Sequence, residues 1–134
     1  MTQAFEKPFT ATPAHIDELG HVNNAVWVQW IQDMATAHWQ AAADPAHVDA
    51  YIWVVIRHEI DYKGNIAEGE QVTGRTWIPG EPKGARFARN VEFVGDGGKI
   101  KVQALTWWAM IDRQSQRPVR VTPEIAAPFL SKNF

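Results

Sequence analysis

The stretch that decides the fold is His15–Trp39, which reads HIDELGHVNNAVWVQWIQDMATAHW. It opens with a polar turn, and residues 20–24 are rich in the Gly and Asn that turns and helix N-caps favour. Buried-type side chains then recur every three or four positions, as on one helix face: Trp27, Trp30, Ile31, Met34 and His38. Asp17 and His21 therefore precede a predicted helix N-terminus, whose free N–H groups suit chemistry on a carbonyl.

The rest of the chain is predicted to be mainly strand around this helix, which we expect over Ala25–Ala43 before Asp44-Pro45 ends it. Strands are predicted over 7–12, 51–62, 71–78, 85–94 and 99–112, with Pro45–Ala50 as a connection, an extended tail over 116–121 and a short helix opening at Thr122. One helix cannot cover both faces of such a sheet. We therefore predict an α+β fold, a five-stranded antiparallel sheet wrapped around one long helix, with its other face meeting a second copy.

Alternation in the strand 51–62 predicts which side chains share a face. Strict alternation puts one set on the apolar face: Ile52, Val54, Ile56, His58, Ile60 and Tyr62. His58 is then either a core histidine or a residue that lines a pocket.

Composition limits the class of protein. The 134 residues suit one domain, over residues 1–134, and the formal charge of −2 argues against a nucleic-acid partner. The lack of cysteine excludes disulfides, thiolate nucleophiles and cysteine zinc sites. A polar N-terminus and the lack of a long apolar run predict a cytoplasmic protein with no membrane partner. The seven tryptophans are expected in a core or a subunit interface.

Residue chemistry alone leaves two readings of Asp17 open. Its carboxylate can act on a thioester or ester carbonyl as a nucleophile or as a base that activates water, or it can simply support the turn. His15, Asp17 and His21 match no known ligand spacing, so we expect no metal.

Four basic residues near strand ends and in the tail offer contacts for the phosphates of a coenzyme A nucleotide, or form an ordinary solvated surface. They are Lys83, Arg86, Arg117 and Arg120.

Residues 17–24, DELGHVNN, resemble the D-x-x-G and H-V-N-N signature of hotdog-fold thioesterases of the 4-hydroxybenzoyl-CoA thioesterase type. Further stretches, 57–62, 107–112 and 117–123, resemble later parts of the same family, so the likeness runs over about residues 9–129. The resemblance implies a hotdog fold whose subunits join edge to edge, with active sites at the dimer interface. It also implies hydrolysis of acyl-CoA thioesters without metal or organic cofactor.

The resemblance assigns roles residue by residue. Asp17 matches the catalytic carboxylate, the backbone N–H of Asn24 matches the group that polarises the thioester carbonyl, and Gly20 matches the glycine that passes close to substrate. His21 becomes a turn residue beside the oxyanion site. Trp27 stands where the family usually has Tyr, which is expected to reshape the acyl pocket. Lys83, Arg117 and Arg120 fall near the family's CoA-phosphate contacts.

These features together predict an acyl-CoA thioesterase that forms a homodimer or a dimer of dimers. The alternatives are a non-catalytic hotdog protein that binds an acyl-CoA or acyl ligand, and, ranked lower, a hotdog hydratase or dehydratase. HVNN is also similar to the plant acyl-ACP thioesterase pattern D-x-N-x-H-V-N-N, although Leu19 replaces its first Asn. The sequence leaves the acyl group, and CoA against acyl-carrier protein, open.

Overall fold

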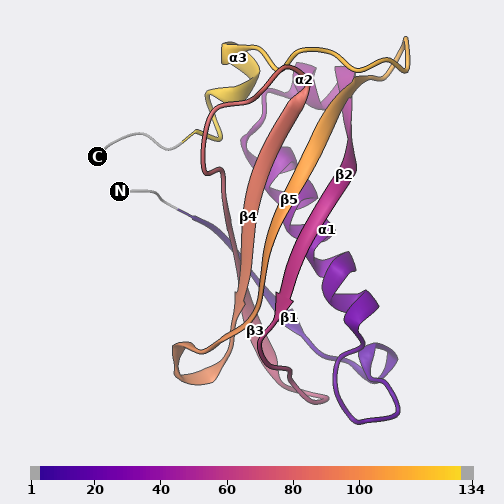
Figure 1. The fold of residues 1–134 in the computed structure, drawn as a ribbon, viewed down its shortest axis with the longest axis vertical. Helices are drawn as coiled ribbons and strands as arrows, with labels where there is room; N and C mark the ends of the chain where they lie inside the picture. The colour runs from indigo at the N-terminus through magenta and orange to yellow at the C-terminus, as the bar shows by residue number, and fades with distance from the viewer. Residues whose placement is uncertain (1–3, 131–134) are drawn as a thin grey trace.

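The computed structural model describes residues 4–130, and its sheet curls along one side of a long helix (Figure 1). The strands are antiparallel throughout and lie in the order β1-β3-β4-β5-β2. The strands are β1 (Phe5–Thr10), β2 (Tyr51–Tyr62), β3 (Gln71–Trp77), β4 (Arg86–Val94) and β5 (Ile100–Asp112). The helices are α1 (Asn24–Ala42), α2 (Pro45–Ala50) and α3 (Pro123–Ala126), with short 3-10 turns at Pro13–His15 and Asp96–Gly98. The predicted α+β architecture, a five-stranded antiparallel sheet with one long helix, is confirmed.

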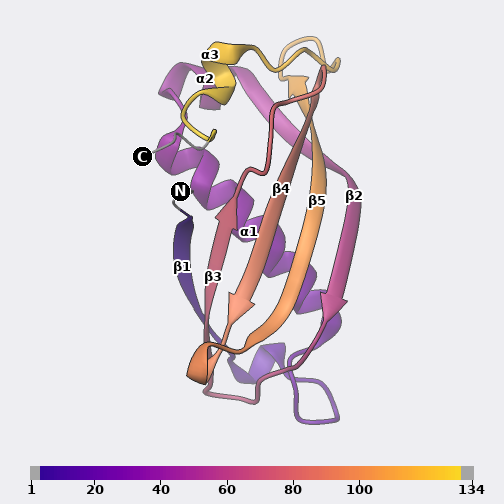
Figure 2. The same ribbon diagram turned by 60° about the vertical axis from the view of Figure 1, so that its left-hand side comes forward.

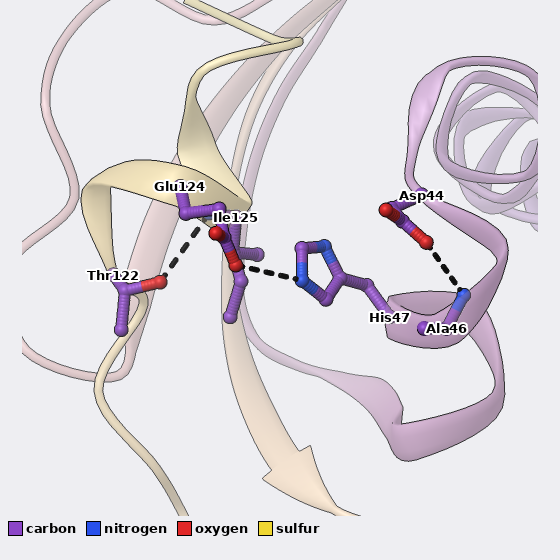
Figure 3. Close-up of polar contacts among 6 residues, drawn as sticks. All are labelled: Asp44, Ala46, His47, Thr122, Glu124 and Ile125. Carbon is purple, nitrogen blue, oxygen red and sulfur yellow. Dashed lines mark hydrogen bonds and ion pairs between the residues drawn. The ribbon is translucent and has the colours of Figure 1, made fainter.

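Helix boundaries follow from local capping. Asn23 caps α1, because its Oδ1 accepts a hydrogen bond from the Ala25 N–H at 2.8 Å. The segment expected to be a connection, residues 45–50, is instead the short helix α2. Asp44 caps it through the Ala46 N–H at 2.8 Å, with Pro45 at the first helical position (Figure 3). The same proline that ends α1 thus begins the next helix.

The tail lies against this end of the molecule, as the second view shows (Figure 2). Thr122 caps α3 as predicted, since its Oγ1 accepts from the Ile125 N–H at 3.3 Å. His47 of α2 lies 3.4 Å from Glu124 of α3, a contact that joins the two short helices (Figure 3). No helix within residues 4–130 is both long and apolar enough to cross a membrane.

The face assignment predicted for residues 51–62 is wrong in its first half. Val55 pairs with Trp108 and Arg57 pairs with Trp107, so a bulge at Ile56 shifts the alternation by one residue. Side chains that pair directly share a face, which places Trp53 and Val55 with His58 on the concave face. Ile52 and Val54 therefore belong to the convex face.

The core between α1 and the sheet consists of two apolar clusters. The first surrounds the N-terminal half of α1 and includes Trp27, Met34 and Phe93. The second surrounds its C-terminal end and includes Trp39, Phe87 and Phe129. Packing in the first is close: a Cβ on Gly74 would lie 2.7 Å from the Met34 Sδ.

A line of polar side chains separates the two clusters, which we call the polar row. It comprises His38, Thr76, Arg89, Thr106 and His58. Thr76 and Thr106 have no exposed surface, and Arg89 is 7 % exposed. On β4, Arg89 stands between Phe87 of one cluster and Val91 of the other, so the row interrupts continuous apolar packing.

Candidate active site

Asp17 and His21 lie at the two ends of a tight hairpin that leads into α1. The Asp17 N–H donates to the His21 C=O at 2.8 Å, and the Gly20 N–H donates to the Asp17 C=O at 3.0 Å. Gly20 has φ +83°, a backbone conformation that favours glycine. The hairpin is thus held by its own backbone, with the side chain of Asp17 half-buried and that of His21 exposed.

One oxygen of the Asp17 carboxylate accepts the hydrogen bonds that stabilise the turn. Its Oδ1 accepts from the Leu19 N–H at 2.9 Å and from the His21 N–H at 3.4 Å. Within residues 4–130, Oδ2 has no hydrogen-bond donor. The turn role proposed for Asp17 is therefore present, and it leaves the second oxygen available for a water or a substrate carbonyl carbon.

The first turn of α1 leaves one backbone donor open. Asn23 takes the Ala25 N–H through its side chain, and its C=O accepts from Val26 at 2.9 Å and from Trp27 at 3.4 Å. The Asn24 N–H has no acceptor in the part of the chain that the structure describes. This N–H lies at the positive end of the helix dipole, where a developing oxyanion is stabilised.

Asn65, in the loop between β2 and β3, fixes this arrangement. Its Oδ1 accepts from the Trp27 Nε1 at 3.3 Å and from the Ile66 N–H at 2.9 Å. Its Nδ2 donates to the Val22 C=O at 3.1 Å. Sequence reasoning misses this clamp, because nothing in a local pattern shows that the loop after β2 returns to the start of α1.

Trp27 is a core residue in this structure, with no exposed surface. Its ring packs 5.1 Å from that of Trp30 and 5.3 Å from that of Phe93. Its expected influence on acyl binding stays a prediction, and it would act through packing beneath the hairpin.

His58 lies on the concave face of β2, where its Nδ1 is 2.8 Å from the Thr106 Oγ1. Its Nε2 is buried without a hydrogen-bond partner within the described residues. Burial lowers the pKa of the imidazole, so the ring is neutral near pH 7. Its predicted part in substrate binding stays a prediction.

Lys83 and Arg86 lie at the start of β4, and Arg117 and Arg120 lie between the end of β5 and α3. Figure 1 shows this end of the sheet opposite the start of α1, which Asp17 precedes. The Lys83 N–H donates to the Arg86 C=O at 2.8 Å, and the Val121 N–H donates to the Gly84 C=O at 2.8 Å, so Arg120 lies beside this turn. Arg117 accepts from the Asp112 N–H at 2.9 Å at the end of β5. Since α1 has 19 residues, it extends about 28 Å from the Asp17 hairpin toward the opposite end of the sheet.

The described residues include no set of side chains placed to act as metal ligands. Across residues 4–130 no group of three or more His, Asp or Glu side chains is placed to hold a metal ion. His15, one of the three residues considered as ligands, instead has its Nδ1 3.0 Å from the Thr12 N–H that donates to it.

Comparison with known proteins adds a family and a fold. Residues 2–129 match the family model described as the acyl-ACP thioesterase N-terminal domain, whereas no curated protein matches. A hypothetical protein from Staphylococcus aureus, solved in complex with CoA, superposes with TM-score 0.82 at 12 % identity, covering 100 % of this chain and 90 % of that one.

Two further structures that are similar to this chain are thioesterases by name. A 1,4-dihydroxy-2-naphthoyl-CoA thioesterase from Synechocystis has TM-score 0.78 and 13 % identity, covering 95 % of this chain and 96 % of that one. An acyl-ACP thioesterase from Bacteroides thetaiotaomicron has TM-score 0.81 and 22 % identity, covering 97 % of this chain but 54 % of that one. The expected hotdog fold is confirmed, and the more specific resemblance to the 4-hydroxybenzoyl-CoA type stays a prediction.

Proposed function

Because the chain belongs to the acyl-ACP thioesterase family, we propose that it hydrolyses an acyl-CoA thioester to the free acid and CoA, with Asp17 as the catalytic carboxylate. One observation carries the proposal: the open Asn24 N–H at the start of α1 follows directly on the hairpin that presents the free Oδ2 of Asp17. A carboxylate and an oxyanion donor are the two groups that hydrolysis of a thioester requires.

The chemistry allows two routes from the same geometry. As a general base, Asp17 takes a proton from water while the water oxygen attacks the carbonyl carbon. As a nucleophile, its Oδ2 attacks the carbon itself and forms an anhydride that water then hydrolyses. In both routes the negative charge moves to the carbonyl oxygen, which accepts a hydrogen bond from the Asn24 N–H, and collapse expels the CoA thiolate, which then takes a proton.

We further propose that the active form is a dimer joined through β2. This strand lies at one edge of the sheet, and its Val54 and Ile56 are 41 % and 46 % exposed. A long apolar edge strand with unpaired backbone groups favours pairing with another strand. Two copies paired antiparallel through β2 would bring the basic end of one copy to the level of the Asp17 hairpin of the other.

That dimer explains how the phosphates of CoA would be bound. Within one chain Lys83, Arg86, Arg117 and Arg120 lie at the far end of the sheet from Asp17, whereas a two-fold axis through paired β2 strands would bring the partner's set to the level of Asp17. The S. aureus relative solved with CoA supports CoA as the carrier, and the Bacteroides relative keeps acyl-carrier protein as the competing one.

The test is a screen for thiol release from short, long and aromatic acyl-CoAs and their acyl-ACP counterparts. On the best substrate, Asp17→Asn should lower kcat by about 100-fold or more, because acid–base groups contribute on the order of 10²–10⁴. Glu18→Gln is the matched control: it removes an exposed carboxylate from the same hairpin and should leave kcat unchanged.

A variant Asp17→Asn with near-normal kcat would overturn the assignment. If the wild-type protein binds CoA but turns over no thioester, the second candidate, a non-catalytic acyl-ligand-binding hotdog protein, replaces the first. After a single turnover in isotopically labelled water, label in the Asp17 carboxylate would identify the nucleophilic route with attack of water on the aspartyl carbon of the anhydride.

A further inference from the structure

A cavity of about 270 Å³ lies beside the C-terminal half of α1, away from the Asp17 hairpin. Aromatic residues from several elements contribute to its walls: Trp39, Tyr51, Trp53, Phe87, Trp108 and Phe129. The α1 residues that line it lie between Ala35 and Gln40, about 17 to 24 Å along the helix axis from Asn24. The cavity is thus a separate feature of the chain.

Arg89 of the polar row lines this cavity and is 7 % exposed. Its Nη1 donates to the Thr76 Oγ1 at 2.9 Å and to the His38 Nδ1 at 2.9 Å. No carboxylate of residues 4–130 lies within ion-pair distance of this guanidinium. Buried cations are almost always paired with an anion. An arginine that lines an aromatic cavity without such a partner is therefore expected to bind one.

The neighbouring histidine does not supply that anion. His38 must be neutral to accept a hydrogen bond from Arg89, and burial together with the arginine charge lowers its pKa to about 4. The Nε and Nη2 groups of Arg89 have no hydrogen-bond partner in the described part of the chain. One edge of the guanidinium therefore remains unused.

Two of the aromatic wall residues also lack acceptors. The Nε1 groups of Trp53 and Trp108 are buried and have no hydrogen-bond partner within residues 4–130. An indole N–H can only donate, and leaving a buried donor without an acceptor is unfavourable. Arg113 also lines the cavity, and its Nε and Nη2 donate to the Asp49 and Val48 C=O groups at 3.0 and 3.4 Å. The residues that line the cavity therefore include two arginines and no carboxylate.

We propose that this cavity binds the acyl part of the substrate, and that this acyl group carries a carboxylate that pairs with Arg89. A carboxylate is planar and matches two parallel N–H groups of a guanidinium, and the aromatic walls suit an apolar ring beside it. The assignment of the ligand as an acyl group rests on the proposed function. The thioester end would then reach the Asp17 hairpin of the second copy.

The test measures binding of free acids, which needs no turnover. Isothermal titration of the purified protein compares 2-naphthoate with the neutral 2-naphthalenemethanol, and the acid should bind at least tenfold more tightly. Arg89→Met removes the positive charge but keeps a side chain of similar length, and it should abolish this preference. Lys99→Met, which removes the same charge from an exposed turn, should retain the preference.

A second measurement avoids any variant. In the wild-type protein, the indole N–H resonances of Trp53 and Trp108 should shift on addition of 2-naphthoate and shift less with the alcohol. Equal affinity for acid and alcohol, or a preference that survives Arg89→Met, would overturn the proposal. So would failure of the acid to bind together with a weaker dimer in Arg89→Met, because a carboxylate of the second copy would then occupy the site.

The outcomes separate this inference from the proposed function. Asp17→Asn should bind 2-naphthoate as the wild type does. Acid binding at Arg89 in a protein that hydrolyses no thioester would support the anion site and refute the catalytic role. Thioester hydrolysis by a protein that shows no preference for the acid over the alcohol would support the catalytic role and refute the anion site.

Discussion

Replacing Asn65 with alanine tests whether one side chain holds the candidate catalytic turn in place. The substitution removes three hydrogen bonds, from the Trp27 Nε1 at 3.3 Å and the Ile66 N–H at 2.9 Å, and to the Val22 C=O at 3.1 Å. Trp27 and Val22 have no exposed surface and Ile66 has 4 %, so water cannot readily replace these bonds.

The expected loss follows from those three bonds. At about 1 kcal/mol for each, Asn65→Ala should lower the free energy of unfolding by about 3 kcal/mol, and Tm by roughly 10 °C for a domain of this size. The Val22 N–H keeps its bond to the Ile66 C=O at 3.1 Å, so the hairpin stays attached but less fixed. Small displacements of reacting groups cost up to about 100-fold in rate, so kcat should fall by about tenfold or more.

Denaturant unfolding at fixed protein concentration and initial rates on the best acyl-CoA measure the two effects. Asn90→Ala is the control, because the Asn90 amide makes no side-chain hydrogen bond in residues 4–130. A loss below about 1 kcal/mol in Asn65→Ala would refute the clamp. A full loss of stability with unchanged kcat would show that the clamp supports the fold but does not position the catalytic turn.

Two more predictions concern the edge of the sheet and the polar row. Ile56→Lys puts a charge on the free edge of β2 and should convert a dimer to a monomer in analytical ultracentrifugation. The control Thr73→Lys, on the exposed convex face of β3, should leave the dimer intact. A dimer that survives Ile56→Lys contradicts pairing through β2. The pKa of His38 is lowered from 6.5 to about 4, chiefly by burial and then by Arg89, so its contribution to stability is complete above about pH 6.5 and is lost as pH falls toward 4. After allowance for solvent screening of the partly exposed ring, the wild type should lose about 2 kcal/mol more than His38→Gln between pH 7 and pH 4 in denaturant unfolding, and equal losses would contradict this.

The architecture was predictable because its signals are local. The three- to four-residue spacing from Trp27 to His38 defines α1, and the Asn23 cap defines its start within one residue of the expected boundary. The faces of β2 were not predictable, since a bulge changes the alternation without any sign in the residue types around Ile56. The helix α2 was missed, although Asp44-Pro45 is typical of a helix start, because the same pair is also typical of a helix end and follows α1.

The candidate site divides in the same way. Asp17 and Asn24 can be picked out from a turn followed by a helix, and the resemblance gives them roles that the geometry leaves open to test. Asn65 and Arg89 cannot be found this way, because their importance depends on partners distant in sequence: Asn65 lies 43 residues from Val22, and Arg89 lies 51 residues from His38.

The polar row has a consequence for how this chain can evolve. Because hydrogen bonds hold this row in place, a change of residue volume at Trp53 or Phe87 must displace the row before it reaches Trp27 and the turn that precedes α1. Substitutions that alter which group fits the cavity can therefore accumulate while the hairpin of Asp17 keeps its geometry. The fold separates the residues free to drift in specificity from those that must keep one arrangement.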